Sequence, residues 1–287
     1  MDKKGWLNVL VESFKDFFKD DGLRLSAALA FYTAFSLAPL LLIAISIAGT
    51  FFGHDAVRGA LEGELKNSMG PSAALVVQDM VANARKPADN VVMSIVGIGL
   101  LLLGAAGAFG QMQAALNKVW NVDPPPKKSI MGYLKDRFLS FSMVLGCGFL
   151  LLLSMLLTTA LQAATEYIDK STSIPLTAWI MGSGILTFVV ITALFAAIFK
   201  FLPDIRISWK DVWAGATFTS ALFMVGKYAI AWYLARQATQ NSYGAAGSFA
   251  LVLTWLYYST IILLIGAEFT QCYSRIRGKG RLDAPKT

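Results

Sequence analysis

The chain alternates between long apolar runs and polar loops, and six runs stand out. A helix of about 20 residues crosses a hydrocarbon core of about 30 Å, and each run is close to that length or longer. Because the core holds no water, each run must satisfy its own backbone hydrogen bonds as an α-helix. The pattern therefore predicts six transmembrane helices, at residues 25–52, 91–109, 138–161, 176–199, 212–234 and 247–272.

Amphipathic patterns lie on both sides of the first run. Residues 1–23 set one apolar face, which comprises Trp6, Leu7, Leu10, Phe14, Phe17 and Phe18, against a charged face. Such a helix lies in the membrane interface or packs on the cytoplasmic ends of the bundle, and both alternatives bury the same face. The loop 53–90 shows two short amphipathic patterns separated by Gly70-Pro71. We expect an external cap of two helices there, either structural or a lid over a cavity.

The predicted fold is therefore all-α and polytopic, with three regions. Residues 1–23 form the amphipathic interfacial helix, and residues 24–273 form the six-helix transmembrane domain with its external helical cap. Residues 274–287 form a basic cytoplasmic tail.

The composition agrees with a membrane protein, and the distribution of charge predicts its orientation in the membrane. The 287 residues are 56% apolar and only 15% charged, whereas soluble proteins carry about 25% charged residues. Of the 25 Lys and Arg, 18 lie in the N-terminal segment, the second and fourth loops and the tail. Positive loops face the cytoplasm, so both termini are expected there. The net charge of +7 then reflects topology and contact with anionic lipid head groups, and no nucleic-acid partner is expected.

Two ionisable residues, Lys227 and Glu268, lie well inside the apolar runs. Such residues are costly in a membrane and are candidates for function, although a structural role stays open for both. A depth count at about 1.5 Å per residue separates them by about 18 Å along the membrane normal, too far for an ion pair. Glu268 matches Arg24 and Gln111 in depth, at the cytoplasmic ends of the first two spans.

Lys227 lies closer to the external surface. It is expected to extend its ammonium outward or to meet hydroxyls such as Thr254 or Ser46.

Pro39 interrupts the first run near its middle and is expected to kink the helix. The kink would free a carbonyl near Phe35, and nearby hydroxyls would line a polar groove with it. These hydroxyls can instead bond to their own helix. The candidate pathway residues are Glu268, Arg24, Tyr32, Ser36, Pro39, Gln111 and Lys227.

Catalytic signatures are missing from the sequence. The single histidine, His54, lies at the external end of a span, so neither a histidine metal cluster nor a Ser-His triad is expected. Cys147 and Cys272 lie within spans at unrelated depths. We therefore predict no catalytic residue, no metal site and no cofactor, and we expect that the protein is not an enzyme.

Four strings together resemble the YihY/BrkB family of bacterial inner-membrane proteins. They are residues 26–42 (SAALAFYTAFSLAPLLL), 117–122 (NKVWNV), 201–204 (FLPD) and 266–269 (GAEF). The resemblance implies six spans and a location in the bacterial cytoplasmic membrane. Some members carry the label ribonuclease BN, but this sequence lacks the clustered His and Asp residues that a metal-dependent nuclease requires. Ribonuclease activity is therefore not expected.

Two functions fit these features. The leading hypothesis is a transporter or lipid-translocating protein of the cell envelope, with a cavity lined by Glu268, Arg24, Tyr32 and Gln111. The alternative is a non-transporting membrane scaffold or envelope-assembly partner, for which the amphipathic helix and the cap are docking surfaces. Membrane lipids are the expected partners, a homo-oligomer is compatible with the sequence, and no substrate is indicated.

Overall fold

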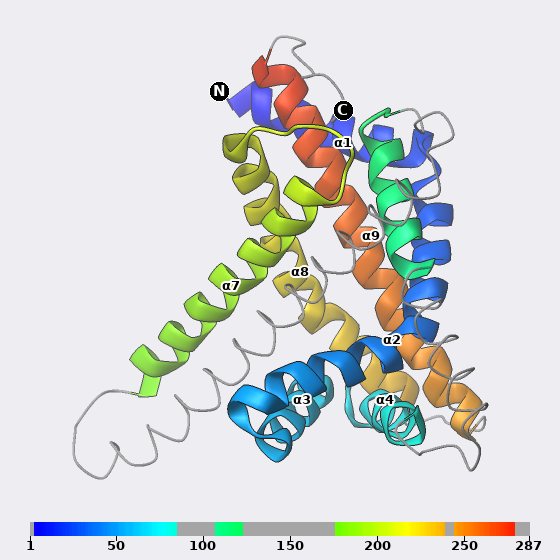
Figure 1. Cartoon of the computed structure of the whole chain (residues 1–287). Helices are drawn as coiled ribbons and strands as arrows, with labels where there is room; N and C mark the ends of the chain where they lie inside the picture. Colours follow the sequence, from blue (N-terminus) through cyan, green and yellow to red (C-terminus); the bar gives the residue numbers. More distant parts are fainter. Residues whose placement is uncertain (1–2, 85–106, 123–175, 239–243, 279–287) are drawn as a thin grey trace.

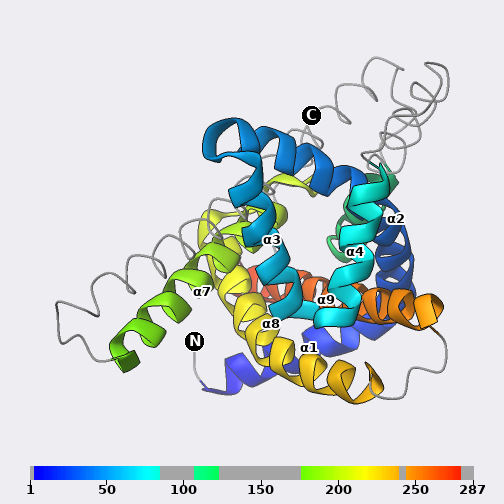
Figure 2. The same ribbon diagram turned by 90° about the horizontal axis from the view of Figure 1, so that it is seen from below.

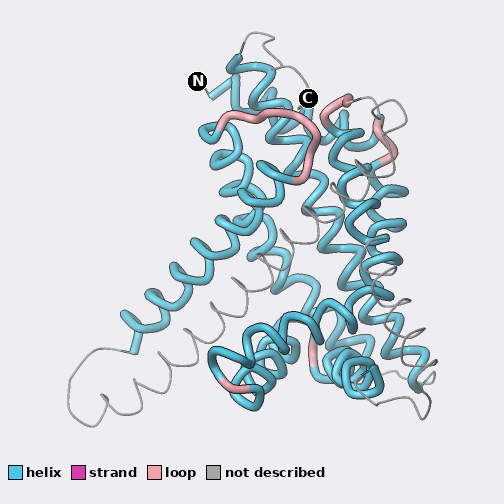
Figure 3. The backbone as a smooth tube through the Cα atoms, viewed as in Figure 1, coloured by secondary structure: helices cyan, strands magenta, loops and turns pink. Residues whose placement is uncertain are grey.

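The computed structural model describes residues 3–84, 107–122, 176–238 and 244–278. Within these ranges the regular elements are all α-helical (Figure 1, Figure 3), as predicted. They are α1 (Lys3–Lys19), α2 (Gly22–Phe52), α3 (His54–Met69), α4 (Pro71–Ala84), a helix over residues 107–119, α7 (Leu176–Phe201), α8 (Trp209–Ala238) and α9 (Gly244–Gly278). The predicted third span and most of the second lie outside the described residues.

Helix α9, 35 residues long, is the element around which the others pack. It contacts α1, α2, α4 and α8 (Figure 1). Its C-terminal half supplies Leu264 and Ala267 to the largest apolar cluster, which also takes residues from α1, α2, α7, α8 and residues 107–122. Its N-terminal half joins a second cluster with α2 and α4. Burial of a side chain such as Leu264, which has no exposed surface, fixes these contacts.

Two described helices contain segments long and apolar enough to cross a membrane. These segments are Gly184–Phe201 in α7 and Gly247–Arg277 in α9, and α2 becomes a third if its two arms count as one span. Helix α8 covers the predicted fifth span and is 30 residues long, but it has no segment as long and as apolar as those of α7 and α9. The count of six spans therefore stays a prediction.

Helix α2 is bent at Pro39, as expected from the missing backbone donor of proline. Its arms, Gly22–Ala38 and Leu40–Phe52, meet at 46°. The bend turns the second arm toward α3 and α4 (Figure 1). The predicted kink is thus confirmed.

The two short helices predicted for residues 53–90 are present as α3 and α4. Each is preceded by a glycine with a positive φ, Gly53 at 86° and Gly70 at 83°. Side chains with a Cβ rarely adopt this conformation, so glycine is favoured at both breaks. Figure 2 views this end of the molecule, where α3 contacts α8 and α4 contacts α9. This end lies opposite α1 (Figure 1).

Helices α8 and α9 cross through two glycines that face two threonines. A Cβ at Gly215 would lie 1.8 Å from Thr270 Oγ1, and a Cβ at Gly266 would lie 1.9 Å from Thr219 Oγ1. Each threonine bonds the glycine carbonyl of its own helix, Thr219 to Gly215 and Thr270 to Gly266, both at 2.7 Å. Each helix thus carries Gly-x3-Thr, and only glycine permits so close an approach.

Helix α1 divides its apolar residues between the protein and the outside. Val9 and Phe17 are buried, and Val9 shares a small cluster with Phe269 of α9. A second apolar stripe stays exposed and comprises Leu7, Val11, Phe14 and Phe18. The sequence predicts one apolar face, buried either in the membrane interface or on the bundle. The structure instead divides the apolar residues of α1 between two arcs. One arc packs on α9, and the other is free for the membrane interface.

Candidate functional site

Glu268 of α9 is 1% exposed, although it lies in a helix that is apolar enough to cross a membrane. Among the described residues, no hydrogen bond or ion pair reaches its carboxylate. The charges that act on it most are Asp20 and Asp16, which disfavour a negative charge, and Arg275 and Lys19, which favour one. A buried acidic group without a direct partner is costly and marks a candidate functional position.

Glu268 belongs to a polar stripe that we define as Thr260, Glu268, Gln271 and Arg275. At 3.6 residues per turn, these positions fall within an arc of about 80° and span about 22 Å along the axis of α9. The side chains at 271 and 260 are 4% and 8% exposed. Leu264 lies on the same face, between Thr260 and Glu268. Apart from this leucine, the stripe gives one side of an apolar helix a polar character.

The polar stripe faces α1 and α2. Thr260 Oγ1 donates a hydrogen bond to the Ser26 carbonyl of α2 at 3.0 Å. At the other end, Arg275 Nη2 lies 2.9 Å from Glu12 Oε2 and 3.1 Å from Asp16 Oδ2 of α1. The stripe thus runs from a charged surface at α1 to a buried position against the first arm of α2.

Several buried polar atoms near the C-terminal half of α9 have no hydrogen-bond partner among the described residues. They are Gln271 Oε1 in the stripe, Ser26 Oγ of α2, Ser220 Oγ of α8 and Trp120 Nε1. Most buried side-chain polar atoms in proteins are paired, so such a group needs an explanation. Gln271 is part of the stripe, and Ser26 contacts it through Thr260. Both unpaired oxygens offer acceptors for a polar solute.

The structure does not bring the predicted pathway residues together around Glu268. Arg24 is exposed and pairs instead with Asp21 at 2.7 Å, because this acidic group precedes it by less than one turn. Ser36 is buried and donates to the Thr33 carbonyl of its own helix at 3.1 Å. The matching depth of Arg24 and Glu268 therefore does not bring their side chains together.

Tyr32 and Gln111 lie at the contact between α2 and the helix over residues 107–119. Tyr32 is 45% exposed, and its Cδ1 would lie 3.2 Å from a Cβ at Gly107. Gln111 is half-buried one turn further along that helix. Within the described ranges, neither Tyr32 nor Gln111 bonds to Glu268.

Lys227 of α8 forms an ion pair with Glu64 of α3, with Nζ and Oε1 at 3.1 Å. Its expected partners Thr254 and Ser46 each donate instead to a carbonyl of their own helix, at 2.8 Å. The alternative in which Lys227 meets these hydroxyls is wrong, because α3 supplies a carboxylate that a depth count along the spans does not consider. The pair ties α3 to α8 and favours a structural role for Lys227.

The basic residues after the last apolar run are partly used within the protein. Helix α9 continues to Gly278, and Arg277 Nη1 lies 3.5 Å from Asp211 Oδ1 of α8. Together with the Arg275 pairs, this shows that both arginines also form ion pairs within the protein. Residues 279–287 of the predicted tail lie outside the described residues.

Sequence reasoning missed a polar contact between the helix over 107–119 and the segment after α7. Asn117 Nδ2 donates to Asp204 Oδ2 at 2.9 Å, and Gln113 Nε2 lies 3.2 Å from both carboxylate oxygens of Asp204. Asn117 and Asp204 belong to two of the strings that carry the family resemblance. The presence of both residues in strings typical of the family marks them as candidates, but the sequence does not show that the two strings are in contact.

Within the described ranges, no three His, Cys, Asp or Glu residues come together as a metal site. Cys272 is buried, and its Sγ lies 3.5 Å from Asp16 Oδ2. The geometry of the polar stripe thus offers carboxylate, amide and hydroxyl groups for binding polar solutes or protons.

Comparison with known proteins identifies relatives over nearly the whole chain. The family model described as Virulence factor BrkB matches residues 13–287. A UPF0761 membrane protein of Pseudoalteromonas translucida is 28% identical over 89% of this chain and 82% of the relative. A UPF0761 membrane protein of Methylibium petroleiphilum is 30% identical over 91% of this chain, which spans 61% of that longer relative. No solved structure gives a significant match.

Proposed function

The chain belongs to the virulence factor BrkB family of membrane proteins, and we propose that it is a transporter or lipid-translocating protein of the cell envelope. The observation that carries the proposal is Glu268, 1% exposed on a helix that is apolar enough to cross a membrane. The polar stripe around it supplies a route from the charged end of α9 toward the interior of the protein.

Energetic cost supports a transport role for Glu268. An ionisable residue inside a membrane helix is costly, by about 2.5–3.5 kcal/mol when it lies at the bilayer centre, and membrane proteins keep such residues where ions, protons or polar substrates need them. Glu268 lies nearer the cytoplasmic end of its span. A purely structural carboxylate would be expected to hold a direct ion pair, as Asp211 does with Arg277. Glu268 has no such pair among the described residues. We infer that its carboxylate binds a proton, a cation or the polar part of a lipid, since no described residue pairs with it.

The proposed topology has six spans in the bacterial cytoplasmic membrane, with both termini in the cytoplasm. The arrangement of the described helices supports it, because α1 lies at one end of the molecule and α3 and α4 lie at the other (Figure 1). In this topology α3 and α4 form an external cap. The polar stripe then opens at the cytoplasmic end of α9, beside α1.

A scaffold or envelope-assembly partner is the second candidate. The observation that favours it is the exposed stripe of α1 formed by Leu7, Val11, Phe14 and Phe18, which offers an apolar surface for another protein. The same surface suits the membrane interface equally well. Under the scaffold proposal, Glu268 would have no role in moving a solute, and this difference decides between the two. For either function we propose no enzymatic activity, ribonuclease activity included.

Reconstitution of the purified protein into lipid vesicles tests the proposal. Fluorescent phospholipids in both leaflets report lipid scrambling when dithionite quenches the outer leaflet, and an entrapped solute reports flux. We expect activity in one of these assays, and Glu268→Gln should lower the initial rate by about tenfold or more, which corresponds to about 1.4 kcal/mol. Asp55→Asn, which removes an exposed carboxylate from α3, is the matched control and should retain the rate.

The outcomes separate the two candidates. Activity that is lost in Glu268→Gln and retained in Asp55→Asn supports transport. No activity in the unmodified protein, or the same rate in Glu268→Gln, contradicts transport and favours the scaffold.

A further inference from the structure

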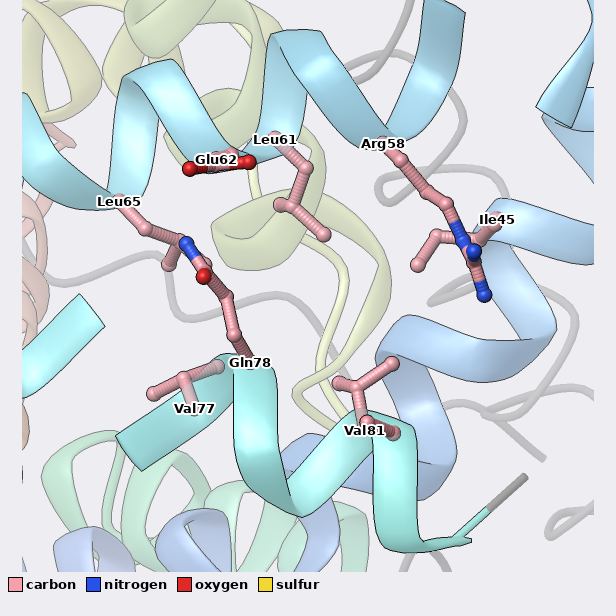
Figure 4. Close-up of a pocket in the computed structure, with 9 residues that line it drawn as sticks. Ile45, Arg58, Leu61, Glu62, Leu65, Val77, Gln78 and Val81 are labelled. Atoms are coloured by element: carbon pink, nitrogen blue, oxygen red, sulfur yellow. The ribbon is translucent and has the colours of Figure 1, made fainter. Parts of the chain in front are cut away.

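A cavity of about 210 Å³ lies between the second arm of α2, α3 and α4 (Figure 4). Its apolar lining comprises Ile45 of α2, Leu61 and Leu65 of α3, and Val77, Val81 and Ala82 of α4. The bend at residue 39 creates this space, because it turns the arm that carries Ile45 toward α3 and α4. The cavity is separate from the polar stripe of α9.

Three polar side chains also line the cavity, and two of them, Arg58 and Gln78, present hydrogen-bond donors. Gln78 Nε2 is buried and has no partner among the described residues. Arg58 has no ion pair there either. The carboxylate of Glu62 is already paired with Lys66 at 2.6 Å. The donors that a ligand would meet are the guanidinium of Arg58, which is exposed, and the buried amide NH2 of Gln78, and acceptor oxygens on the ligand would satisfy both.

The two donors come from opposite walls of the cavity. Figure 4 shows the guanidinium of Arg58, from α3, beside Ile45, and the amide of Gln78, from α4, beside Leu65. The side chains of Leu61 and Val81 lie between them in this view. A ligand that satisfies both donors must carry oxygens at two positions and apolar surface between or beside them.

We propose that this cavity binds an anionic amphiphile from the membrane. Its anionic head contacts Arg58, a second oxygen accepts the hydrogen bond from Gln78, and a hydrocarbon segment lies against Leu61 and Val81. The volume fits a segment and not a whole lipid, since an apolar cavity of about 150 Å³ holds benzene and pockets for drug-sized ligands exceed about 300 Å³. The rest of the molecule then extends into the bilayer.

The surroundings favour a membrane source for this ligand. The second arm of α2 continues directly from the first, and the two together are the candidate broken span, so in the proposed topology the arm that carries Ile45 lies at the membrane. Guanidinium groups bind phosphate and carboxylate through two parallel N–H donors, which suits either a phospholipid or a free fatty acid. A phospholipid brings a phosphate and ester carbonyls, whereas a fatty acid brings one carboxylate.

Native mass spectrometry of the delipidated, detergent-purified full chain tests the site. The probes are phosphatidylglycerol, phosphatidylcholine and oleate, and unfolding temperature with each probe is a second readout. We expect tighter binding of phosphatidylglycerol or oleate than of phosphatidylcholine. Arg58→Gln should weaken binding of the preferred probe about tenfold or more, because a charge-assisted hydrogen bond is lost. Arg206→Gln, which removes an exposed arginine after α7, should leave binding unchanged.

Gln78→Leu distinguishes a glutamine that binds the ligand from one that only stabilises the fold. Replacing an unpartnered buried amide with an apolar side chain of similar size should raise the unfolding temperature of the lipid-free protein while it weakens lipid binding several-fold. A preference for phosphatidylglycerol identifies the occupant as a phospholipid, and a preference for oleate identifies a fatty acid. Equal binding of phosphatidylcholine and both anionic probes, or unchanged binding in Arg58→Gln, overturns the proposal.

These measurements do not depend on the transport proposal. Glu268→Gln should bind the preferred probe as the unmodified protein does, because Glu268 does not line this cavity. A protein that binds lipid here and moves no lipid or solute would refute transport alone. A protein that transports but binds no anionic amphiphile through Arg58 would refute this site alone.

Discussion

Asn117 and Asp204, 87 residues apart in the chain, hold each other through hydrogen bonds in both directions. Asn117 Nδ2 donates to Asp204 Oδ2, the backbone N–H of Asp204 donates to Asn117 Oδ1, and both distances are 2.9 Å. The contact attaches the helix over residues 107–119 to the segment that joins α7 and α8. It therefore fixes one end of the bundle, beside the apolar cluster that contains Leu264.

Removal of this contact should destabilise the protein. Asn117→Ala leaves the carboxylate and backbone N–H of Asp204 without their main partner, which should cost about 1–3 kcal/mol. Chemical or thermal unfolding in detergent micelles measures the change. Arg206→Ala, two residues from Asp204 and exposed, is the matched control and should unfold like the unmodified protein. Identical unfolding of Asn117→Ala and the control would show that the contact contributes nothing.

The crossing of α8 and α9 gives a second prediction. Gly215→Ala and Gly266→Ala each place a methyl group less than 2 Å from a threonine hydroxyl of the other helix, at 1.8 Å and 1.9 Å. The helices must separate, and such overpacking costs about 1–3 kcal/mol. Unfolding measurements should show the loss, and Thr270→Ala should recover part of it in the Gly215→Ala protein.

A glycine without neighbours provides the control for this prediction. A methyl group added at Gly59 in α3 would meet none of the described residues within 4 Å, so Gly59→Ala should stabilise the helix by about 0.5–1 kcal/mol. If Gly215→Ala and Gly59→Ala change stability in the same direction, the close approach of α8 and α9 is contradicted.

Helix positions and breaks could be predicted from the sequence because they depend on local chemistry. The first predicted span ends at Phe52 and so does α2, and Pro39 bends it. Gly70-Pro71 separates α3 from α4 because a residue with positive φ is followed by one without a backbone donor. These features need only the residues themselves.

Contacts between distant residues could not be predicted from the sequence. Lys227 finds Glu64, 163 residues away, because α3 folds back against α8. A depth count considers only the spans, so it offers Lys227 the outer surface or nearby hydroxyls and not the carboxylate of Glu64. Arg24 was matched in depth to Glu268, but Asp21 is a closer partner by sequence. Depth orders residues along the membrane normal and does not say which helices are neighbours.

The face of α1 that packs on the protein was also beyond sequence reasoning. Periodicity identifies apolar positions, but lipid and protein interior are both apolar, so it does not distinguish Phe17, which is buried, from Phe18, which is 62% exposed. Glu268 was found for a different reason. A single acidic residue in an apolar run needs no knowledge of its neighbours to be noticed.

Access of water to the polar stripe tests the central proposal most directly. Single cysteines at 268, 271 and 270 are introduced into a Cys147→Ser, Cys272→Ala protein, and a membrane-impermeant thiol reagent is applied from the cytoplasmic side of membrane vesicles. Positions 268 and 270 are about equally buried, at 1% and 0% exposure, but Thr270 packs against Gly215 of α8 and lies off the stripe. A pathway along the stripe predicts modification of Glu268→Cys and Gln271→Cys and none of Thr270→Cys. If the cysteines at 268 and 271 stay as unreactive as the cysteine at 270, the stripe is a dry packing surface and the proposed pathway is wrong.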